Sequence, residues 1–169
     1  SRGAILPVVL DFAARLFPRV VVLAVRDRQI IPIAGRGVPA LERPATALPP
    51  IDLESVRDGW IGRVLETRSA ARGRPDGEGD RALLAHLGLP ETLPAYVGPI
   101  ESSGAVIALV YGADSGPGGS ELPDPSGLEV VLHHAGIALD HAALERALAE
   151  SEETPDAGRP PESAERPRG

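Results

Sequence analysis

The chain has 169 residues, a formal net charge of −7 at pH 7 and no cysteine. This length suits one domain of ordinary size with a single core. The acidic excess, together with 17 scattered basic residues, argues against nucleic-acid binding and against attachment to anionic membranes. Without cysteine, the chain has no disulfides, thiolate nucleophiles, thiolate metal sites or thioether-linked cofactors. No apolar run approaches the roughly 18 to 20 residues that a membrane-spanning helix needs, so we expect a cytoplasmic domain.

The N-terminal part of the sequence predicts a helix followed by a β-hairpin. Residues 4–17 place apolar side chains at helical spacing, and Pro18 ends that helix. Residues 19–26 are nearly all β-branched or aliphatic, which indicates a strand buried on both faces. A tight turn leads to a second strand over residues 29–35, where Pro32 belongs at an edge or a bulge.

The next segment predicts a loop and two helices. Four prolines between residues 37 and 50 indicate an irregular loop, and residues 53–67 carry an apolar stripe that is typical of one helix. Asp80 can cap a third, short helix that extends through Leu87 and ends at Gly88.

Residues 93–116 contain the hairpin around which the rest of the chain is organised. Residues 96–100 and 105–111 are β-prone, and residues 101–104 between them predict a turn. The second of these runs has no strongly polar side chain. We therefore expect it to lie in the middle of a sheet with both faces covered.

A long C-terminal helix is predicted from its N-cap at Asp124 to about Glu150. Residues 151–169 combine proline with charge and have no aliphatic side chain larger than alanine, which predicts a disordered tail after a domain of residues 1–150. The helix carries two apolar stripes. The stripe expected to cover the sheet consists of Leu128, Val131, Leu132, Ala135 and Leu139.

The second stripe follows the alternating four- and three-residue spacing of a coiled-coil seam. We expect two copies of the chain to form a homodimer through it, unless the first helix covers part of the stripe. Its residues are Val130, His134, Ile137, His141, Leu144 and Leu148.

The central hairpin has an apolar-Pro-apolar strand, VGPI at residues 97–100, and a second strand that ends in YGAD at residues 111–114. With the order of the predicted elements, this pattern resembles the GAF domain family over residues 5–150, although one alanine separates the usual Gly-Asp pair. Residues 51–53 and 80–88 are also similar to GAF-like domains of multidomain bacterial signalling and motility proteins. The resemblance implies an α/β (α+β) fold: a central antiparallel sheet, with the first and last helices on one face and short helices and loops on the other.

The same resemblance implies a non-enzymatic regulatory module that senses a small molecule, forms dimers or does both, with other domains or signalling proteins as partners. By family analogy, a pocket under the short helices would be lined by Trp60, Arg63, Arg72, Tyr96 and Tyr111. Core packing is the alternative for Trp60 and both tyrosines, and a filled pocket would leave a purely structural interaction module. No cofactor is expected. The family's bilin-attaching cysteine and the Lys and Asn of its cyclic-nucleotide motif are absent here.

Candidates for metal binding or catalysis are weak. His141 and Glu145 have helical i, i+4 spacing, but two ligands make a poor metal site. Ser102, Ser103 and Ser115 lack the Gly-x-Ser-x-Gly elbow of a hydrolase. We therefore expect no metal and no catalytic residue, with a hydrolase as the least favoured function.

Overall fold

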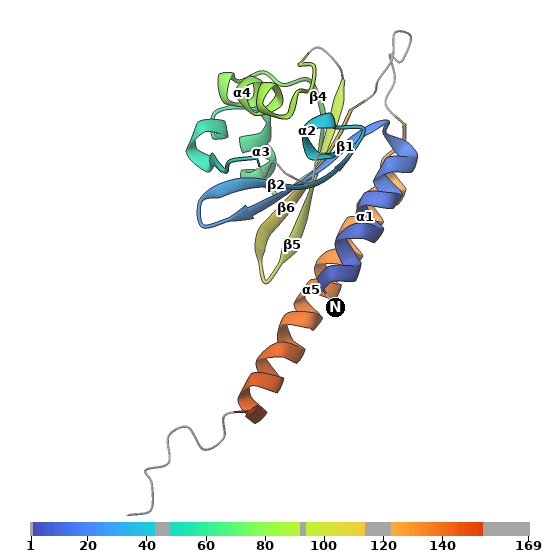
Figure 1. The fold of residues 1–169 in the computed structure, drawn as a ribbon, viewed down its shortest axis with the longest axis vertical. Helices are drawn as coiled ribbons and strands as arrows, with labels where there is room; N and C mark the ends of the chain where they lie inside the picture. Colours follow the sequence, from blue (N-terminus) through green and yellow to red (C-terminus); the bar gives the residue numbers. More distant parts are fainter. Residues whose placement is uncertain (1, 43–47, 92–93, 114–122, 154–169) are drawn as a thin grey trace, which may run out of the picture.

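A six-stranded antiparallel sheet carries two long helices on one face and the short helices on the other (Figure 1). The structure is a computed structural model that describes residues 2–42, 48–91, 94–113 and 123–153. This arrangement confirms the predicted α+β architecture. In chain order the elements are α1 (Arg2–Leu16), β1 (Arg19–Arg26), β2 (Gln29–Arg36), α2 (Pro39–Glu42), β3 (Ile51–Asp52), the 3₁₀ helix η1 (Leu53–Val56), α3 (Trp60–Thr67), β4 (Ala71–Gly73), α4 (Glu78–Leu87), β5 (Ala95–Ser102), β6 (Ala105–Ala113) and α5 (Ser126–Glu153).

The two most apolar segments form the centre of the sheet. The strand order is β3-β2-β1-β6-β5-β4, which places β1 beside β6. Residues 20–23 of β1 and 108–113 of β6 are buried, as their continuous apolar sequence predicts. Pro32 lies opposite Leu23 beside a bulge in β2 and outside the two residues of β2 that pair with β3, which is a position where a strand tolerates proline.

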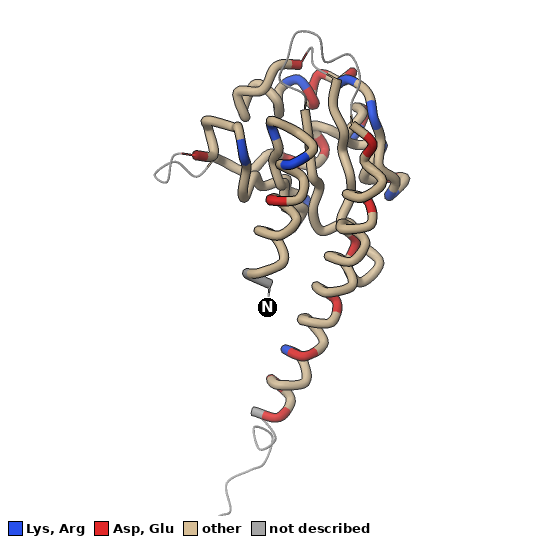
Figure 2. Tube along the Cα trace, turned by 90° about the vertical axis from the view of Figure 1, so that its right-hand side faces the viewer, with Lys and Arg blue, Asp and Glu red and all other residues tan. Residues whose placement is uncertain are grey.

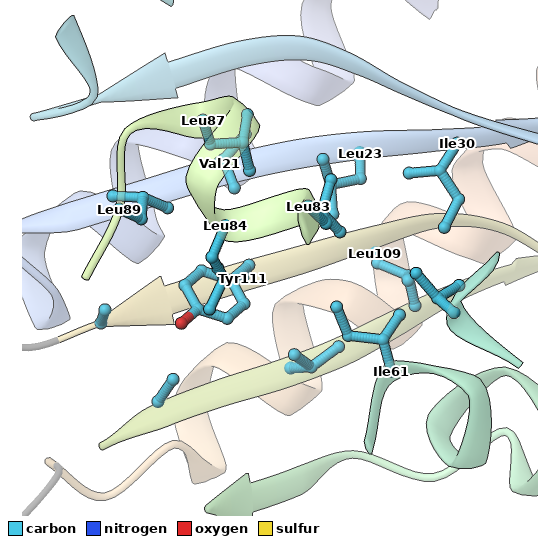
Figure 3. Close-up of a cluster of buried hydrophobic side chains, with 14 of the residues drawn as sticks. Val21, Leu23, Ile30, Ile61, Leu83, Leu84, Leu87, Leu89, Leu109 and Tyr111 are labelled. Atoms are coloured by element: carbon cyan, nitrogen blue, oxygen red, sulfur yellow. The ribbon is translucent and has the colours of Figure 1, made fainter. Parts of the chain in front are cut away.

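The sheet separates two hydrophobic cores. On one face, α3 and α4 pack over the centre of the sheet, and Ile61, Leu83 and Leu84 meet Leu109 and Tyr111 (Figure 3). On the other face, α1 and α5 cover the sheet. Their core contains Val9, Leu10, Ala13, Phe17, Val20, Val22, Tyr96, Ile100, Ala108, Val110, Leu128, Leu132, Ala135 and Leu139.

The β5–β6 hairpin turns at two residues, not at the four that the sequence predicts. Ser102 pairs with Ala105, and between them Ser103 and Gly104 adopt φ angles of 54° and 76°. Two positive φ values are typical of a type I′ turn, which matches the twist of paired strands. Asp140 of α5 holds this turn, because its carboxylate accepts hydrogen bonds from the Ser103 N–H at 2.7 Å and from both serine hydroxyls.

One extra residue in β6 decides which way the side chains of β5 face. The register shifts between the pairs Glu101–Val106 and Ile100–Ala108, so Ile107 has no partner of its own. A slip of one residue moves every side chain beyond it to the other face of a sheet. The bulge therefore reverses the facing of the first part of β5 relative to a regular hairpin.

Asp80 caps the helix that the sequence predicts, α4, from the third position of its first turn, and it also caps α3. It is fully buried in the first turn of α4, and its carboxylate accepts a hydrogen bond from the Trp60 N–H at 2.7 Å, at the start of α3. The Ile61 and Gly77 N–H groups lie 3.4 Å from the same carboxylate. A Cβ on Gly59 would lie 2.4 Å from one of its oxygens, so only glycine fits there. One buried carboxylate thus joins the starts of two helices.

Several short elements also differ from expectation. The helix predicted over residues 53–67 is divided into η1 and α3 by an extended Gly59. The helix α2 occurs inside the predicted loop, and β4 adds a short strand beside β5. Before α5, the Asp124 carboxylate accepts the Ser126 N–H at 3.0 Å, in agreement with its predicted capping role. The helix continues slightly beyond its predicted end, and residues 154–169 of the predicted tail lie outside the described residues.

Candidate functional site

Trp60 and Tyr111 lie together in the core beneath the short helices. Their rings meet edge to face with centroids 6.2 Å apart, and both side chains are buried. Neither the Trp60 Nε1 nor the Tyr111 hydroxyl has a hydrogen-bond partner within the described residues. Burial, with a smaller contribution from the negative charge of Asp80, raises the pKa of Tyr111, so its phenol stays neutral. These two aromatics fill the interior.

Tyr96 faces the opposite side of the sheet, and this corrects the predicted common pocket. Val97, not Tyr96, lies opposite Tyr111 in the β5–β6 register. The ring of Tyr96 stacks on Phe17 at the end of α1, with centroids 5.8 Å apart and planes 12° from parallel. A regular two-residue hairpin would place Tyr96 directly opposite Tyr111. The bulge in β6 separates them.

The two arginines of the predicted pocket lie at the surface. Arg63 is on α3 and pairs with Asp76, while Arg72 on β4 lies 4.0 Å from Asp124. The Arg63 guanidinium hydrogen-bonds the Asp76 carboxylate and holds the pKa of that group below its usual value. The five residues expected in one pocket therefore do not converge.

The space between the sheet and the short helices is occupied by side chains. Leu83, Leu84 and Leu87 of α4 are each about 1% exposed, and they pack against Trp60 and Tyr111. Such burial leaves the interior with the close packing of an ordinary core. A pocket that is filled by side chains favours an interaction module over a small-molecule sensor at this place in the fold.

The fold is shared with domains of bacterial signalling proteins, although the sequence matches no protein-family model and no curated protein. The GAF domain/HD domain protein from Geobacter sulfurreducens superposes with a TM-score of 0.65 at 17% identity, over 85% of this chain and 95% of that chain. The second GAF domain of DevS from Mycobacterium smegmatis gives 0.62 at 18% identity, over 88% and 99%. The chain has a GAF-like fold. A methyl-accepting chemotaxis protein segment is also similar, with a TM-score of 0.64 at 17% identity over 85% and 90%.

The long helix of this GAF-like domain leaves one apolar stripe uncovered. Val130, Ile137, Leu144 and Leu148 are 56%, 52%, 58% and 57% exposed, although each is a large hydrophobic side chain. They lie on the side of α5 that faces away from the sheet, because the buried residues Leu128, Leu132, Ala135 and Leu139 occupy the other side. The alternative that α1 covers this stripe is wrong for the four aliphatic residues.

A groove runs between α1 and α5 beside this stripe. It has a volume of about 540 Å³ and is lined by Ile5, Val8 and Val9 of α1 and by small and apolar residues of α5. His134 and His141, which the sequence assigns to the seam, lie in the wall of this groove. The groove and the exposed stripe together form one apolar surface along the outside of α5.

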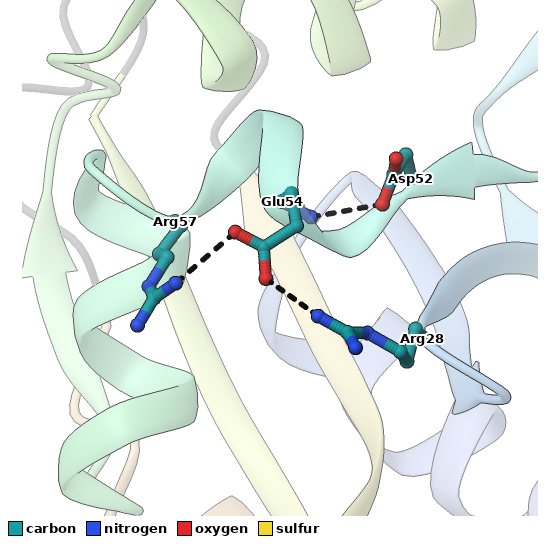
Figure 4. A network of polar contacts seen from close by, with 4 residues as sticks. All are labelled: Arg28, Asp52, Glu54 and Arg57. Carbon is teal, nitrogen blue, oxygen red and sulfur yellow. Dashed lines mark hydrogen bonds and ion pairs between the residues drawn. The ribbon is translucent and has the colours of Figure 1, made fainter.

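The polar contacts on the short-helix side are satisfied internally. Glu54 lies between Arg28 and Arg57, at 3.0 and 3.2 Å, and its backbone N–H donates to Asp52 (Figure 4). Hydrogen bonds from Arg57 and Arg28 lower the pKa of Glu54. Each of the two arginines therefore has a carboxylate partner in Glu54, although the three side chains together keep one net positive charge.

The described residues show no catalytic or metal-binding constellation. Ser102 and Ser103 hydrogen-bond Asp140 as a turn cap, and Ser115 lies outside the described residues. His141 pairs with Glu145 at 3.0 Å, and within the described ranges no three His, Asp or Glu side chains are grouped as metal ligands. In the same residues, we find no helix with the length and apolarity needed to cross a bilayer.

Proposed function

We propose that this GAF-like domain is a non-enzymatic regulatory module of a signalling protein and that it acts by forming a homodimer through α5. The exposed stripe of Val130, Ile137, Leu144 and Leu148 carries this proposal. The stripe repeats with heptad spacing, which a partner helix of the same kind can match. The solved structures with this fold include a methyl-accepting chemotaxis protein and a sensor histidine kinase domain, which supports a signalling role.

The free end of α5 supports a helical partner. From Leu144 to Glu152 every residue is exposed, and Figure 1 shows this part extending past the N-terminal end of α1. Isolated helices shorter than about 12 to 15 residues are marginal in water. A second copy packed along the stripe would stabilise this segment by covering Leu144 and Leu148.

The expected affinity is moderate. The four aliphatic side chains are already about half buried, so covering the rest contributes about 1 kcal/mol each, or about 8 kcal/mol for both copies. Association itself costs on the order of 4 to 15 kcal/mol in lost freedom. Burial of the groove residues of α1 adds to the gain. The four aliphatic residues alone would therefore give at most a dimer in the millimolar range, and a dimer in the micromolar range requires the groove residues of α1 to be buried as well.

The charge of α5 adds a salt dependence. Acidic residues outnumber basic ones along this helix (Figure 2). Two such helices side by side repel each other, and salt screens that repulsion. We therefore expect dimerisation to strengthen as ionic strength rises. The residues concerned are Glu129, Asp140, Glu145, Glu150, Glu152 and Glu153, against Arg146.

The test is the mass in solution of the parent chain and of Ile137→Glu with Leu144→Glu, by analytical ultracentrifugation over a range of concentrations. The matched control is Ala147→Glu with Ala149→Glu, which adds the same charge to the same helix away from the stripe. We expect the parent and the control to dimerise and the stripe variant to stay a folded monomer, with a cooperative melting transition and at most a small loss of helical circular dichroism from the end of α5. A parent that is monomeric at high micromolar concentration, or a control that dissociates equally, would rule out this interface.

A further inference from the structure

A hollow of about 440 Å³ opens at the edge of the sheet, beside the first half of α5. One wall is the segment that leaves α3, and the other is the first half of α5. The floor belongs to β5. Its lining residues are Arg68, Ser69, Ala70, Tyr96, Pro99, Glu101, Glu129, Leu132 and His133.

The hollow forms because the strand β4 and the helix α3 both end beside it. The strand β4 pairs only with residues 95–97, so the edge of β5 is uncovered from Gly98 onward. Arg68 ends α3 in the left-handed conformation, with φ of 57°, and turns the chain across the edge of the sheet. Gly136 brings α5 against β5, since a Cβ there would lie 2.1 Å from the carbonyl oxygen of Glu101. The turn at Arg68 keeps the two walls apart at one end, and the close approach at Gly136 closes the hollow at the other end.

Opposite charges face the hollow from its two walls. Arg68 lines it from the α3 side, and Glu129 lines it from α5, where His133 follows one turn later. Within the described part of the chain, neither the Arg68 guanidinium nor the Glu129 carboxylate has an ion-pair partner. The surface between them is mixed: Leu132 and Pro99 supply apolar area, while Ser69 and Glu101 add polar groups, so Glu101 brings a second carboxylate to the lining.

A buried hydroxyl without a partner lies at the wall. Tyr96 is 1% exposed and its hydroxyl makes no hydrogen bond within the described residues. The hydroxyl is close to Leu132 and above Gly98, where a Cβ would lie 2.5 Å from it. Burial and then the negative charge of Glu129 raise the pKa of Tyr96, so the phenol keeps its proton and needs an acceptor. Buried donors in native proteins are usually paired, so this one points to a missing acceptor.

We propose that this hollow binds a free α-amino acid with an apolar side chain. The carboxylate would accept hydrogen bonds from Arg68 and the Tyr96 hydroxyl, and the ammonium group would pair with Glu129. The side chain would pack on Leu132 and Pro99. A molecule that carries only one of the two charges would form only one of the two ion pairs and should bind more weakly.

This site is independent of the proposed dimer. Glu129 and Leu132 face the hollow, whereas Val130 and Ile137 are exposed on the outer side of α5. His133 is three residues from Val130 and four from Ile137 and therefore borders the stripe, but the proposed ligand contacts do not use it. A ligand that bridges Arg68 and Glu129 would join the end of α3 to α5. The stripe variant Ile137→Glu with Leu144→Glu should therefore bind the ligand with unchanged affinity, which separates failure of this proposal from failure of the dimer.

The experiment uses isothermal titration of the whole chain with L-leucine, its decarboxylated analogue isoamylamine and its deaminated analogue isocaproate. We expect L-leucine to bind and both analogues to bind at least about tenfold more weakly. Arg68→Gln and Glu129→Gln should each weaken leucine binding by about tenfold or more. The matched controls Arg74→Gln and Glu66→Gln, on exposed residues outside the hollow, should change it less than about twofold.

Tyr96→Phe separates a binding role from a structural one. It removes the unpaired hydroxyl and keeps the ring on Phe17, so we expect an equal or higher melting temperature without ligand together with several-fold weaker leucine binding. Equal binding of leucine and isocaproate would overturn the proposal. So would an equal loss in the control variants, or no binding of leucine, isoleucine, valine or phenylalanine below about 10 mM.

Discussion

Replacing Asp80 by alanine removes the one carboxylate that joins the starts of α3 and α4. The Trp60 N–H donates to it at 2.7 Å, and the Ile61 and Gly77 N–H groups lie at 3.4 Å. All three donors lie at helix starts, where no intrahelical carbonyl can accept them. The variant would leave the Trp60 N–H buried without an acceptor, and Gly59 would face a small void.

The expected loss in the free energy of unfolding follows from one hydrogen bond of 2.7 Å and two contacts of 3.4 Å to the Asp80 carboxylate. A hydrogen bond to a charged group contributes about 1.5 to 3 kcal/mol, and a helix N-cap about 1 kcal/mol. Counting the 2.7 Å bond fully and the 3.4 Å contacts at a fraction, we expect Asp80→Ala to lower the free energy of unfolding by about 3 kcal/mol. For a domain of this size, that corresponds to a fall in melting temperature of roughly 6 to 12 °C.

Urea denaturation and amide exchange would test this. Glu78→Ala is the control, because Glu78 is an exposed carboxylate in the same first turn of α4. We expect Asp80→Ala to lose protection of the Trp60 amide, while Glu78→Ala costs about 0.5 kcal/mol and leaves that amide unchanged. A loss below about 1 kcal/mol for Asp80→Ala, or an unaltered Trp60 amide, would refute the capping role.

Two further changes test how α5 is held against the sheet. Gly136→Ala should destabilise the domain by about 1 to 3 kcal/mol in urea denaturation, because a Cβ would lie 2.1 Å from the Glu101 carbonyl oxygen; helix propensity alone predicts a gain of about 1 kcal/mol, so a more stable variant would contradict the packing. Hydrogen bonds from the Ser102 hydroxyl, and more weakly from Ser103, lower the pKa of Asp140. Its contribution to stability is therefore present above the carboxyl's unfolded pKa of about 4 and is lost as pH falls through the lower folded value. We expect Asp140→Asn to be less stable than the parent at pH 7 and to lose less stability between about pH 5 and 2; parallel melting curves for both proteins across that range would show that Asp140 does not hold the turn.

The strands at the centre of the sheet could be predicted because their sequence alone requires burial. Residues 19–26 and 105–111 are continuous apolar runs, and a segment of this kind is stable only where both faces are covered. The predicted strand over residues 19–26 agrees with β1 at both ends. The two stripes of α5 could likewise be predicted from the spacing of its apolar residues, because side chains three and four residues apart share a helix face.

The short elements could not be predicted in the same way. The apolar stripe of residues 53–67 continues through Gly59, so periodicity indicates one helix where the structure has two. The division depends on Asp80, which lies far along the sequence and supplies the cap of the second helix. The strand β4 is too short to show a pattern, and only its pairing with β5 defines it.

The sequence by itself determined the central strands, the long helix and the positions of its two apolar stripes, because each depends on the spacing of apolar and polar side chains along one segment. The fold class followed from the resemblance to the GAF family, and only the tertiary structure showed that the second stripe is uncovered. The tertiary structure decided which side chains share a site. Tyr96 and Tyr111 lie on opposite faces because of one bulged residue in β6, and a change of register leaves no trace in the apolar pattern of either strand. The sheet-edge hollow depends in the same way on where β4 ends and on how closely Gly136 lets α5 approach. Contacts between distant segments set both features, so local sequence patterns do not contain them.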